Sequence, residues 1–165
     1  MLERNTIGGA STTKCLVIVH SYHHNNTAKI ANEFSKVLQA KVITTEQVNL
    51  EGLLAYDLIG FGAGIDSGRH YKPLLDLVDR LPEVSEKVGF IFSTSAIQWK
   101  NKVKKDHALL RQKLEAKGYL IVGEFSCLGF NTNSFLKYFK GMNKNRPNRE
   151  DLKNASEFAM SLIDR

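Results

Sequence analysis

Seven polar residues, Ser21–Thr27, stand between the apolar run Cys15–Val19 and a segment with helical periodicity. They carry hydroxyl, amide and imidazole groups, and none of them is lysine or arginine. The first-turn amides of a helix have no partners within the helix, and the helix dipole favours negative charge there. This stretch therefore predicts an anion site that holds a phosphate through amides and hydroxyls.

Two further segments rich in glycine or hydroxyl residues follow apolar runs. Gly62–Gly68 follows Tyr56–Gly62, and Ser93–Ala96 follows Val88–Phe92. In open parallel sheets, ligands sit beyond the carboxyl ends of the strands. Together with Ser21–Thr27, these two turns predict one ligand that reaches across several strands.

The segments that must position these turns alternate between strand and helix. The predicted strands are Cys15–Val19, Lys41–Thr44, Tyr56–Gly62, Val88–Phe92 and Tyr119–Phe125. The predicted helices begin at Thr27, cover His70–Leu81 and Lys104–Lys117, and end with one that Asn148 caps, with Asp151 as its capping-box partner. This alternation predicts an α/β fold in which a parallel sheet is covered by helices on both faces.

The composition is that of a single soluble domain. A chain of 165 residues suits one hydrophobic core, and no apolar run approaches the ~20 residues of a membrane span. Residues 1–68 carry a net charge of −1, and residues 69–165 carry +7. Because the bases alternate with acids on helical segments, we expect a solvated surface, with neither nucleic acid nor membrane as a partner.

The first residues and the cysteines bear on the compartment. Met1–Thr13 has no hydrophobic block, so we expect a disordered leader or the remnant of a tag, with the folded domain spanning residues 14–165. Cys15 and Cys127 are far apart and have no metal-binding spacing, which is typical of reduced thiols in a cytoplasmic protein. We expect this protein to be a monomer.

The motifs of several other parallel-sheet proteins are missing from the sequence. A dinucleotide fingerprint needs G-x-G-x-x-G after the first strand, whereas the glycines between positions 60 and 64 follow the third strand. No P-loop is present, and no nucleophile, base and acid stand at a readable spacing, so no catalytic residue is predicted. His20, His23, His24 and His70 come from different turns without ligand spacing, so no metal site is predicted.

Several segments resemble those of flavodoxins. They are residues 56–75 (YDLIGFGAGIDSGRHYKPLL), 90–95 (FIFSTS), 123–130 (GEFSCLGF) and 143–152 (NKNRPNREDL), and they are similar to a short bacterial and archaeal subgroup. The first turn resembles the flavodoxin FMN-phosphate loop, which ends in an Asn-Thr pair that opens the helix, as Asn26-Thr27 do here. Asn25 stands where the family usually has glycine, and His23 and His24 replace hydroxyl residues. The resemblance runs from about Lys14 to the C-terminus.

This resemblance implies a three-layer, doubly wound flavodoxin-like sandwich with a five-stranded parallel sheet in the order 2-1-3-4-5, and one noncovalently bound FMN. The implied FMN-binding residues are Ser21, Tyr22, His23, His24, Asn25, Asn26 and Thr27 at the phosphate, Gly62, Ala63, Gly64 and Ile65 in one clamp loop, Ser93, Thr94, Ser95 and Ala96 in the other, and Trp99 as a candidate stacking residue. Asparagine tolerates a left-handed backbone almost as well as glycine, so the turn at Asn25 should keep its form. The family also implies that a peptide at Gly62–Gly64 rotates when the flavin is reduced.

The function that the resemblance implies is that of an electron carrier, which shuttles single electrons between larger redox proteins. One alternative is an FMN-dependent oxidoreductase that takes hydride from NAD(P)H and reduces a small acceptor. Another is a flavin-free structural or regulatory module. Bases in or just after the two clamp loops favour acidic redox partners, whereas flavodoxins are typically acidic themselves; these bases are Arg69, His70, Lys72, Lys100 and Lys102.

Overall fold

The computed structural model describes residues 12–22, 24–99, 101–131 and 141–165, and the sheet at its centre has the predicted topology. Five parallel strands lie in the order β2-β1-β3-β5-β6, which is 2-1-3-4-5 when the short strand β4 is left out. Their bounds are β1 (Cys15–His20), β2 (Lys41–Thr44), β3 (Leu58–Asp66), β4 (Arg69–His70), β5 (Lys87–Ser95) and β6 (Tyr119–Leu128). The flavodoxin-like α/β fold class is therefore confirmed. Most of the predicted leader, residues 1–11, lies outside the described residues.

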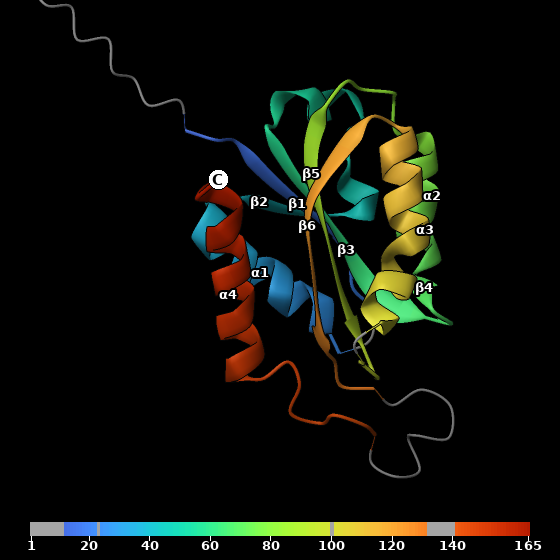
Figure 1. The fold of residues 1–165 in the computed structure, drawn as a ribbon, viewed down its shortest axis with the longest axis vertical. Helices are drawn as coiled ribbons and strands as arrows, with labels where there is room; N and C mark the ends of the chain where they lie inside the picture. Colours follow the sequence, from blue (N-terminus) through green and yellow to red (C-terminus); the bar gives the residue numbers. More distant parts are fainter. Residues whose placement is uncertain (1–11, 23, 100, 132–140) are drawn as a thin grey trace, which may run out of the picture.

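Helices cover both faces of this sheet, which makes three layers. Helices α1 (Asn26–Leu38) and α4 (Arg149–Ile163) lie on one face, and α2 (Lys72–Arg80) and α3 (Lys102–Ala116) lie on the other (Figure 1). Two short 3-10 helices, η1 (Thr45–Gln47) and η2 (Glu51–Ala55), lie between β2 and β3. The capping box predicted between Asn148 and Asp151 is confirmed at the start of α4.

Each face of the sheet has its own apolar core. The core under α1 and α4 is aromatic: the Phe34 ring packs edge-on against Phe90 and Phe92, with centroids 5.4 and 5.0 Å away. The core under α2 and α3 is mainly aliphatic and includes Ile59 and Leu110, both fully buried. Burying apolar surface on both faces fixes the register of the central strands, and therefore the positions at which those strands end.

Two of the predicted turns are strands in the structure. β3 runs to Asp66 and β5 runs to Ser95, so Gly62–Ile65 and Ser93–Ser95 are paired in the sheet. A Cβ on Gly60 would overlap the Phe90 ring, and one on Gly62 would overlap the Phe92 ring. The sequence pattern predicts a turn here because glycine serves two purposes, a turn and a close approach of side chains. A peptide rotation at Gly62–Gly64 would have to break pairing with β1 and β5, so it costs more than the glycines alone suggest, and it stays a prediction.

The turn after β3 lies further along the chain and forms a hairpin. Asp66 pairs with Arg69 across the two residues Ser67 and Gly68, whose φ angles are 51° and 77°. Positive φ at both central residues is the geometry of the tightest hairpin turns, and glycine supplies it without strain. His70 therefore belongs to β4 and not to a helix.

None of the helices in the part of the chain that the structure describes is both long enough and apolar enough to cross a membrane.

Candidate functional site

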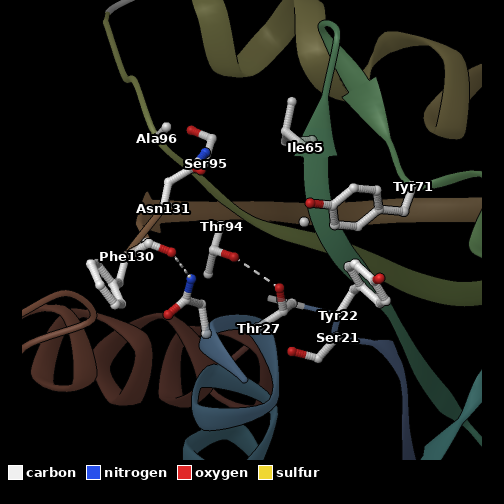
Figure 2. Close-up of a pocket in the computed structure, with 13 residues that line it drawn as sticks. Ser21, Tyr22, Thr27, Ile65, Tyr71, Thr94, Ser95, Ala96, Phe130 and Asn131 are labelled. Atoms are coloured by element: carbon white, nitrogen blue, oxygen red, sulfur yellow. Dashed lines mark hydrogen bonds between the residues drawn. The ribbon is translucent and has the colours of Figure 1, made fainter. Parts of the chain in front are cut away.

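A pocket lies at the carboxyl edge of the parallel sheet, where α1 begins (Figure 2). It is lined by residues from the β1–α1 turn, the β3–β4 hairpin, the end of β5 and the segment after β6: Ser21, Tyr22, Asn26, Thr27, Gly64, Ile65, Tyr71, Thr94, Ser95, Ala96, Gly129, Phe130 and Asn131. Segments from four distant parts of the sequence thus meet at the edge where the sequence predicts a ligand.

The first turn of α1 forms one wall of this pocket. His24 and Asn25 both have φ of 52°, and this left-handed pair turns the chain from β1 into the helix. The amide of Ala28 donates to Ser21 Oγ at 3.3 Å. The remaining first-turn amides lack intrahelical partners, and the helix dipole adds partial positive charge. This wall can bind an anion without a basic side chain.

Asn26 offers a buried acceptor beside this helix start. Its Nδ2 donates to the carbonyl oxygen of Phe130 at 2.7 Å, which assigns the two ends of the amide because a carbonyl can only accept. Its Oδ1 is buried and has no hydrogen-bond partner within the described structure. Because a buried unpaired acceptor is unfavourable, it suits a ligand that brings a donor such as a hydroxyl.

Thr27 joins the helix start to the sheet. Its Oγ1 lies 2.8 Å from Thr94 Oγ1, and both side chains are buried. One residue further along β5, the carbonyl of Ser95 accepts from the amide of Gly129 at 2.9 Å. The end of β5 is therefore fixed between α1 and the segment that follows β6.

Asn143 supports the pocket from outside. Its Nδ2 donates to the carbonyl of Ala96 at 2.8 Å and to that of Gly129 at 3.3 Å. Nearby, the amide of Phe130 donates to the carbonyl of Arg146 at 3.1 Å. The segment Asn143–Arg146 thus connects the turn after β5 to the segment after β6, both of which line the pocket.

An aromatic ring from the hairpin side forms the opposite wall (Figure 2). Tyr71 follows β4, and its amide donates to the carbonyl of Gly64 at 3.0 Å. A Cβ on Gly64 would overlap the Tyr71 ring, so glycine is needed here for close approach. Gly64 is not among the residues with a positive φ, so close approach and not a left-handed backbone accounts for the glycine.

The structure brings together most of the predicted site residues, but not all of them. Those that line the pocket are Ser21, Tyr22, Asn26, Thr27, Gly64, Ile65, Thr94, Ser95 and Ala96. His24 packs against Phe130 instead, with ring centroids 4.2 Å apart. Gly62 and Ala63 lie within the sheet, and His23 is outside the described residues.

Trp99 does not line the pocket. Its side chain is 59% exposed, and the Lys102 ammonium lies 5.8 Å from its ring centroid. The pocket-lining residues that sequence reasoning missed are Tyr71, Gly129, Phe130 and Asn131. Two of the resembling segments, residues 56–75 and 123–130, contain the first three of them, but nothing in their spacing identified those residues as wall residues.

A charged network lies behind β5, on the face covered by α3. Ser93 is fully buried, and its Oγ lies 2.7 Å from His107 Nε2. His107 Nδ1 lies 3.0 Å from Glu124 Oε2, and Arg111 Nη2 donates to the same oxygen at 2.8 Å. Burial opposes ionisation of Glu124, yet hydrogen bonds from His107 and Arg111 and their charges lower its pKa to about 2.

His70 lies beside this network and is neutral. Burial, with a smaller contribution from the charge on His107, lowers the pKa of His70 to about 3. Its Nε2 donates to the carbonyl of Phe92 at 3.0 Å, and its ring centroid is 4.9 Å from that of His107. Within the described ranges, no group of three or more His, Cys, Asp or Glu side chains is arranged to hold a metal ion.

The paired bases near the hairpin differ from the exposed basic surface expected from the sequence. Lys102 forms a short ion pair with Asp106, and Lys72 Nζ lies 2.6 Å from Asp76 Oδ2. His70 is buried and uncharged, so it adds nothing to the surface charge, and Lys100 is outside the described residues. Arg69 is an exposed base at the tip of the hairpin.

Comparison with known proteins gives one family. The family model described as a flavodoxin domain matches residues 17–163. An uncharacterised protein of Methanocaldococcus jannaschii is 41% identical over 150 residues, which cover 91% of this chain and 98% of that protein.

Solved structures of flavodoxins share the fold at low sequence identity. Oxidised flavodoxin 2 from Bacillus cereus has a TM-score of 0.70 at 19% identity, covering 92% of this chain and 99% of that one. A flavodoxin from the domain Archaea has a TM-score of 0.65 at 17% identity, covering 92% of this chain and 97% of that one. A short-chain flavodoxin associated with a bacterial microcompartment has a TM-score of 0.67 at 16% identity, covering 92% of this chain and 98% of that one.

Replacing Asn143 by aspartate tests the support of the pocket. The change keeps the shape but removes both N–H donors and places a carboxylate against two carbonyl oxygens. We expect the free energy of unfolding to fall by about 1–3 kcal/mol, measured by urea denaturation. The matched control is Asn145→Asp, at an exposed position two residues away. Equal effects of the two substitutions would contradict the supporting role of Asn143.

Folding stability should decrease as the pH falls below about 6.5. The unfolded chain protonates His70 near pH 6.5, whereas the folded protein does so only near 3, so the unfolded state binds more protons between these values. This one group lowers the free energy of unfolding by at most about 1.4 kcal/mol for each pH unit. Glu124, whose pKa is also lowered, adds a loss of the same sign below about 4.5. In urea denaturation at several pH values, His70→Gln should flatten the slope between pH 6.5 and 4.5, and an unchanged slope would contradict the assignment.

Proposed function

Because the chain belongs to the flavodoxin family, we propose that it binds one FMN noncovalently in this pocket and carries single electrons between larger redox proteins. The observation that carries the proposal is the meeting of the α1 N-terminus with the carboxyl ends of β3 and β5 in one pocket. FMN, when bound, supplies one-electron and two-electron redox chemistry. The residues of this chain bind and orient it.

The phosphate would lie at the first turn of α1. Ser21 Oγ and the first-turn amides can donate to it, and the left-handed backbone at Asn25 keeps these amides directed to one place. No lysine or arginine is needed in the turn, since the helix start supplies both donors and partial charge. Asn26 Oδ1, the buried unpaired acceptor, would accept from a hydroxyl of the ribityl chain.

The flavin ring would lie between the hairpin and the turn after β5. Tyr71 and Ile65 line the pocket on the hairpin side, and Ala96 lines it on the other (Figure 2). We propose Tyr71 as the aromatic neighbour of the ring, in place of Trp99, because Tyr71 lines the pocket and Trp99 does not. The apolar walls would exclude water from one edge of the ring.

We further propose that the partners are acidic redox proteins. Residues 69–165 carry a net charge of +7, and exposed Arg69 stands at the tip of the hairpin that forms one wall of the pocket. Exposed apolar side chains lie close in sequence to pocket residues: Ile97 is 47% exposed and Trp99 is 59% exposed. Exposed apolar side chains together with an exposed base form a surface that an acidic protein can dock on.

Flavin titration of an Asn26 variant tests the binding proposal. Asn26→Ala removes the unpaired acceptor and the bond to Phe130, so FMN affinity should fall by about 1–3 kcal/mol. Asn32→Ala, at an exposed position on the same helix, should leave the affinity within about 0.5 kcal/mol. Equal losses for the two variants would place the flavin elsewhere, and a folded wild-type protein that takes up no flavin would support the flavin-free module.

The same flavin-loaded protein separates a carrier from an enzyme. Under anaerobic conditions, a one-electron donor such as photoreduced deazaflavin should bleach it, whereas NAD(P)H alone should leave it yellow. Rapid bleaching by NAD(P)H without a reductase would overturn the carrier proposal in favour of the oxidoreductase.

Charge reversal at Arg69 tests the partner proposal. Arg69→Glu should slow reduction by an acidic ferredoxin and weaken the salt dependence of that rate, because one favourable charge pair is lost. Arg165→Glu makes the same charge change at the C-terminus, at the opposite end of the molecule from the hairpin (Figure 1), and should have little effect. If both substitutions change the rate equally, only the net charge matters and the docking surface is wrong.

A further inference from the structure

The buried network behind β5 contains a serine, a histidine and a glutamate in the arrangement that activates a nucleophile in many hydrolases. Ser93, on β5, and His107, on α3, are both completely buried, so no substrate reaches the serine hydroxyl. The hydroxyl of Ser93 also donates to Ser126 Oγ at 2.9 Å, which leaves no proton for the histidine to remove. Ser93 therefore does not act as a nucleophile. The property of the network that can affect the pocket is its charge.

The directions of the hydrogen bonds fix the protons of His107. Since Ser93 donates to Ser126, its oxygen must accept from His107 Nε2–H. On the other side, ionised Glu124 can only accept, so His107 Nδ1 must also carry a hydrogen. A histidine that donates through both ring nitrogens is an imidazolium cation.

The surrounding charges support a cation at this place. Glu124, from β6, is shared between His107 and Arg111, so the three groups together carry one positive charge. On the hairpin side the facing group is neutral His70, and in the first turns of α3, before His107, the ion pair of Lys102 with Asp106 has no net charge. Of the charged and titratable groups that face His107, Glu124 is the one that stabilises its proton.

The network is connected to the pocket through β5 and the turn that follows it. Ser93 immediately precedes Thr94 and Ser95, which line the pocket. Ser126 accepts from Gln98 Nε2 at 2.7 Å, and Gln98 lies in the turn that begins with the pocket residue Ala96. A cation held here lies directly behind the wall against which the flavin would bind.

We propose that His107 is a buried imidazolium that positions the β5 wall of the pocket and favours negative charge on the group bound there, so that the protein holds reduced flavin more tightly than it would with a neutral residue. The identity of the bound group rests on the proposed function. The charge on His107 is inferred from its hydrogen bonds and does not depend on flavin binding. A positive charge in a water-poor interior acts more strongly on a nearby anion than a solvated surface lysine does.

Nitrogen NMR of the histidine rings tests the charge without any flavin. At pH 7 both ring nitrogens of His107 should give the resonances of a protonated imidazolium. In Glu124→Gln, which replaces the carboxylate by a neutral amide, one nitrogen should become unprotonated. A wild-type spectrum with one protonated and one bare nitrogen would overturn the proposal, and this result stands whether or not the protein binds flavin.

Flavin affinities in the two redox states test the consequence. His107→Gln should weaken binding of reduced FMN several-fold more than binding of oxidised FMN, which appears as a lower midpoint potential. Gln98→Ala removes a contact of the same network but no charge, and should leave the ratio of the two affinities unchanged. Equal weakening of both redox forms in His107→Gln would mean a purely structural role and would overturn the proposal. If His107→Gln does not fold, His107→Asn provides the same comparison, since it also replaces the imidazolium by a neutral amide; if no variant takes up flavin, it is the proposed function that fails.

Discussion

The hydrogen bond between Thr27 Oγ1 and Thr94 Oγ1, 2.8 Å long and buried, connects the two parts of the molecule on which its site depends. It fixes the first turn of α1 against the end of β5, so that the unpaired amides of the helix lie beside the central strands. It also brings together the polar groups of the helix start and the sheet edge, on a helix that the apolar core holds against the sheet. Together these groups form one pocket, which the hairpin and the segment after β6 close from the sides.

The two faces of β5 have different electrostatic characters, and this division gives the site its properties. The α1 face is neutral and polar, with hydroxyls, an amide and a helix start, which suits a phosphate and a ribityl chain. The α3 face holds a charged network of His107, Glu124 and Arg111, closed to solvent at the histidine. Consecutive residues of a strand point to opposite faces of the sheet. Ser93 therefore contacts His107 of the charged network, while Thr94 contacts Thr27 on the neutral α1 face.

The fold was predictable from the sequence because its signals are local and repeated. Apolar runs, helical spacing and the capping pair Asn148 and Asp151 each identify one element, and their alternation allows few topologies. The site was only partly predictable. Glycines at 62 and 64 have the same appearance whether they form a turn or accommodate an aromatic ring, and only the positions of Phe92 and Tyr71 decide between these. Gly129 and Phe130 come from a connection without periodicity, and the pairing of Lys72 and Lys102 with aspartates depends on helix geometry.

The most direct test of the central claim is the location of the phosphate at the start of α1. Amide resonances of the ¹⁵N-labelled apoprotein can be followed during titration with FMN and, separately, with riboflavin, which lacks the phosphate. We predict that FMN shifts the amides of Asn26, Thr27 and Ala28 strongly, that riboflavin shifts them little, and that both ligands shift Tyr71 and Ala96. Equal shifts at the helix start with both ligands, or FMN-induced shifts confined to another surface, would contradict the assignment of this pocket.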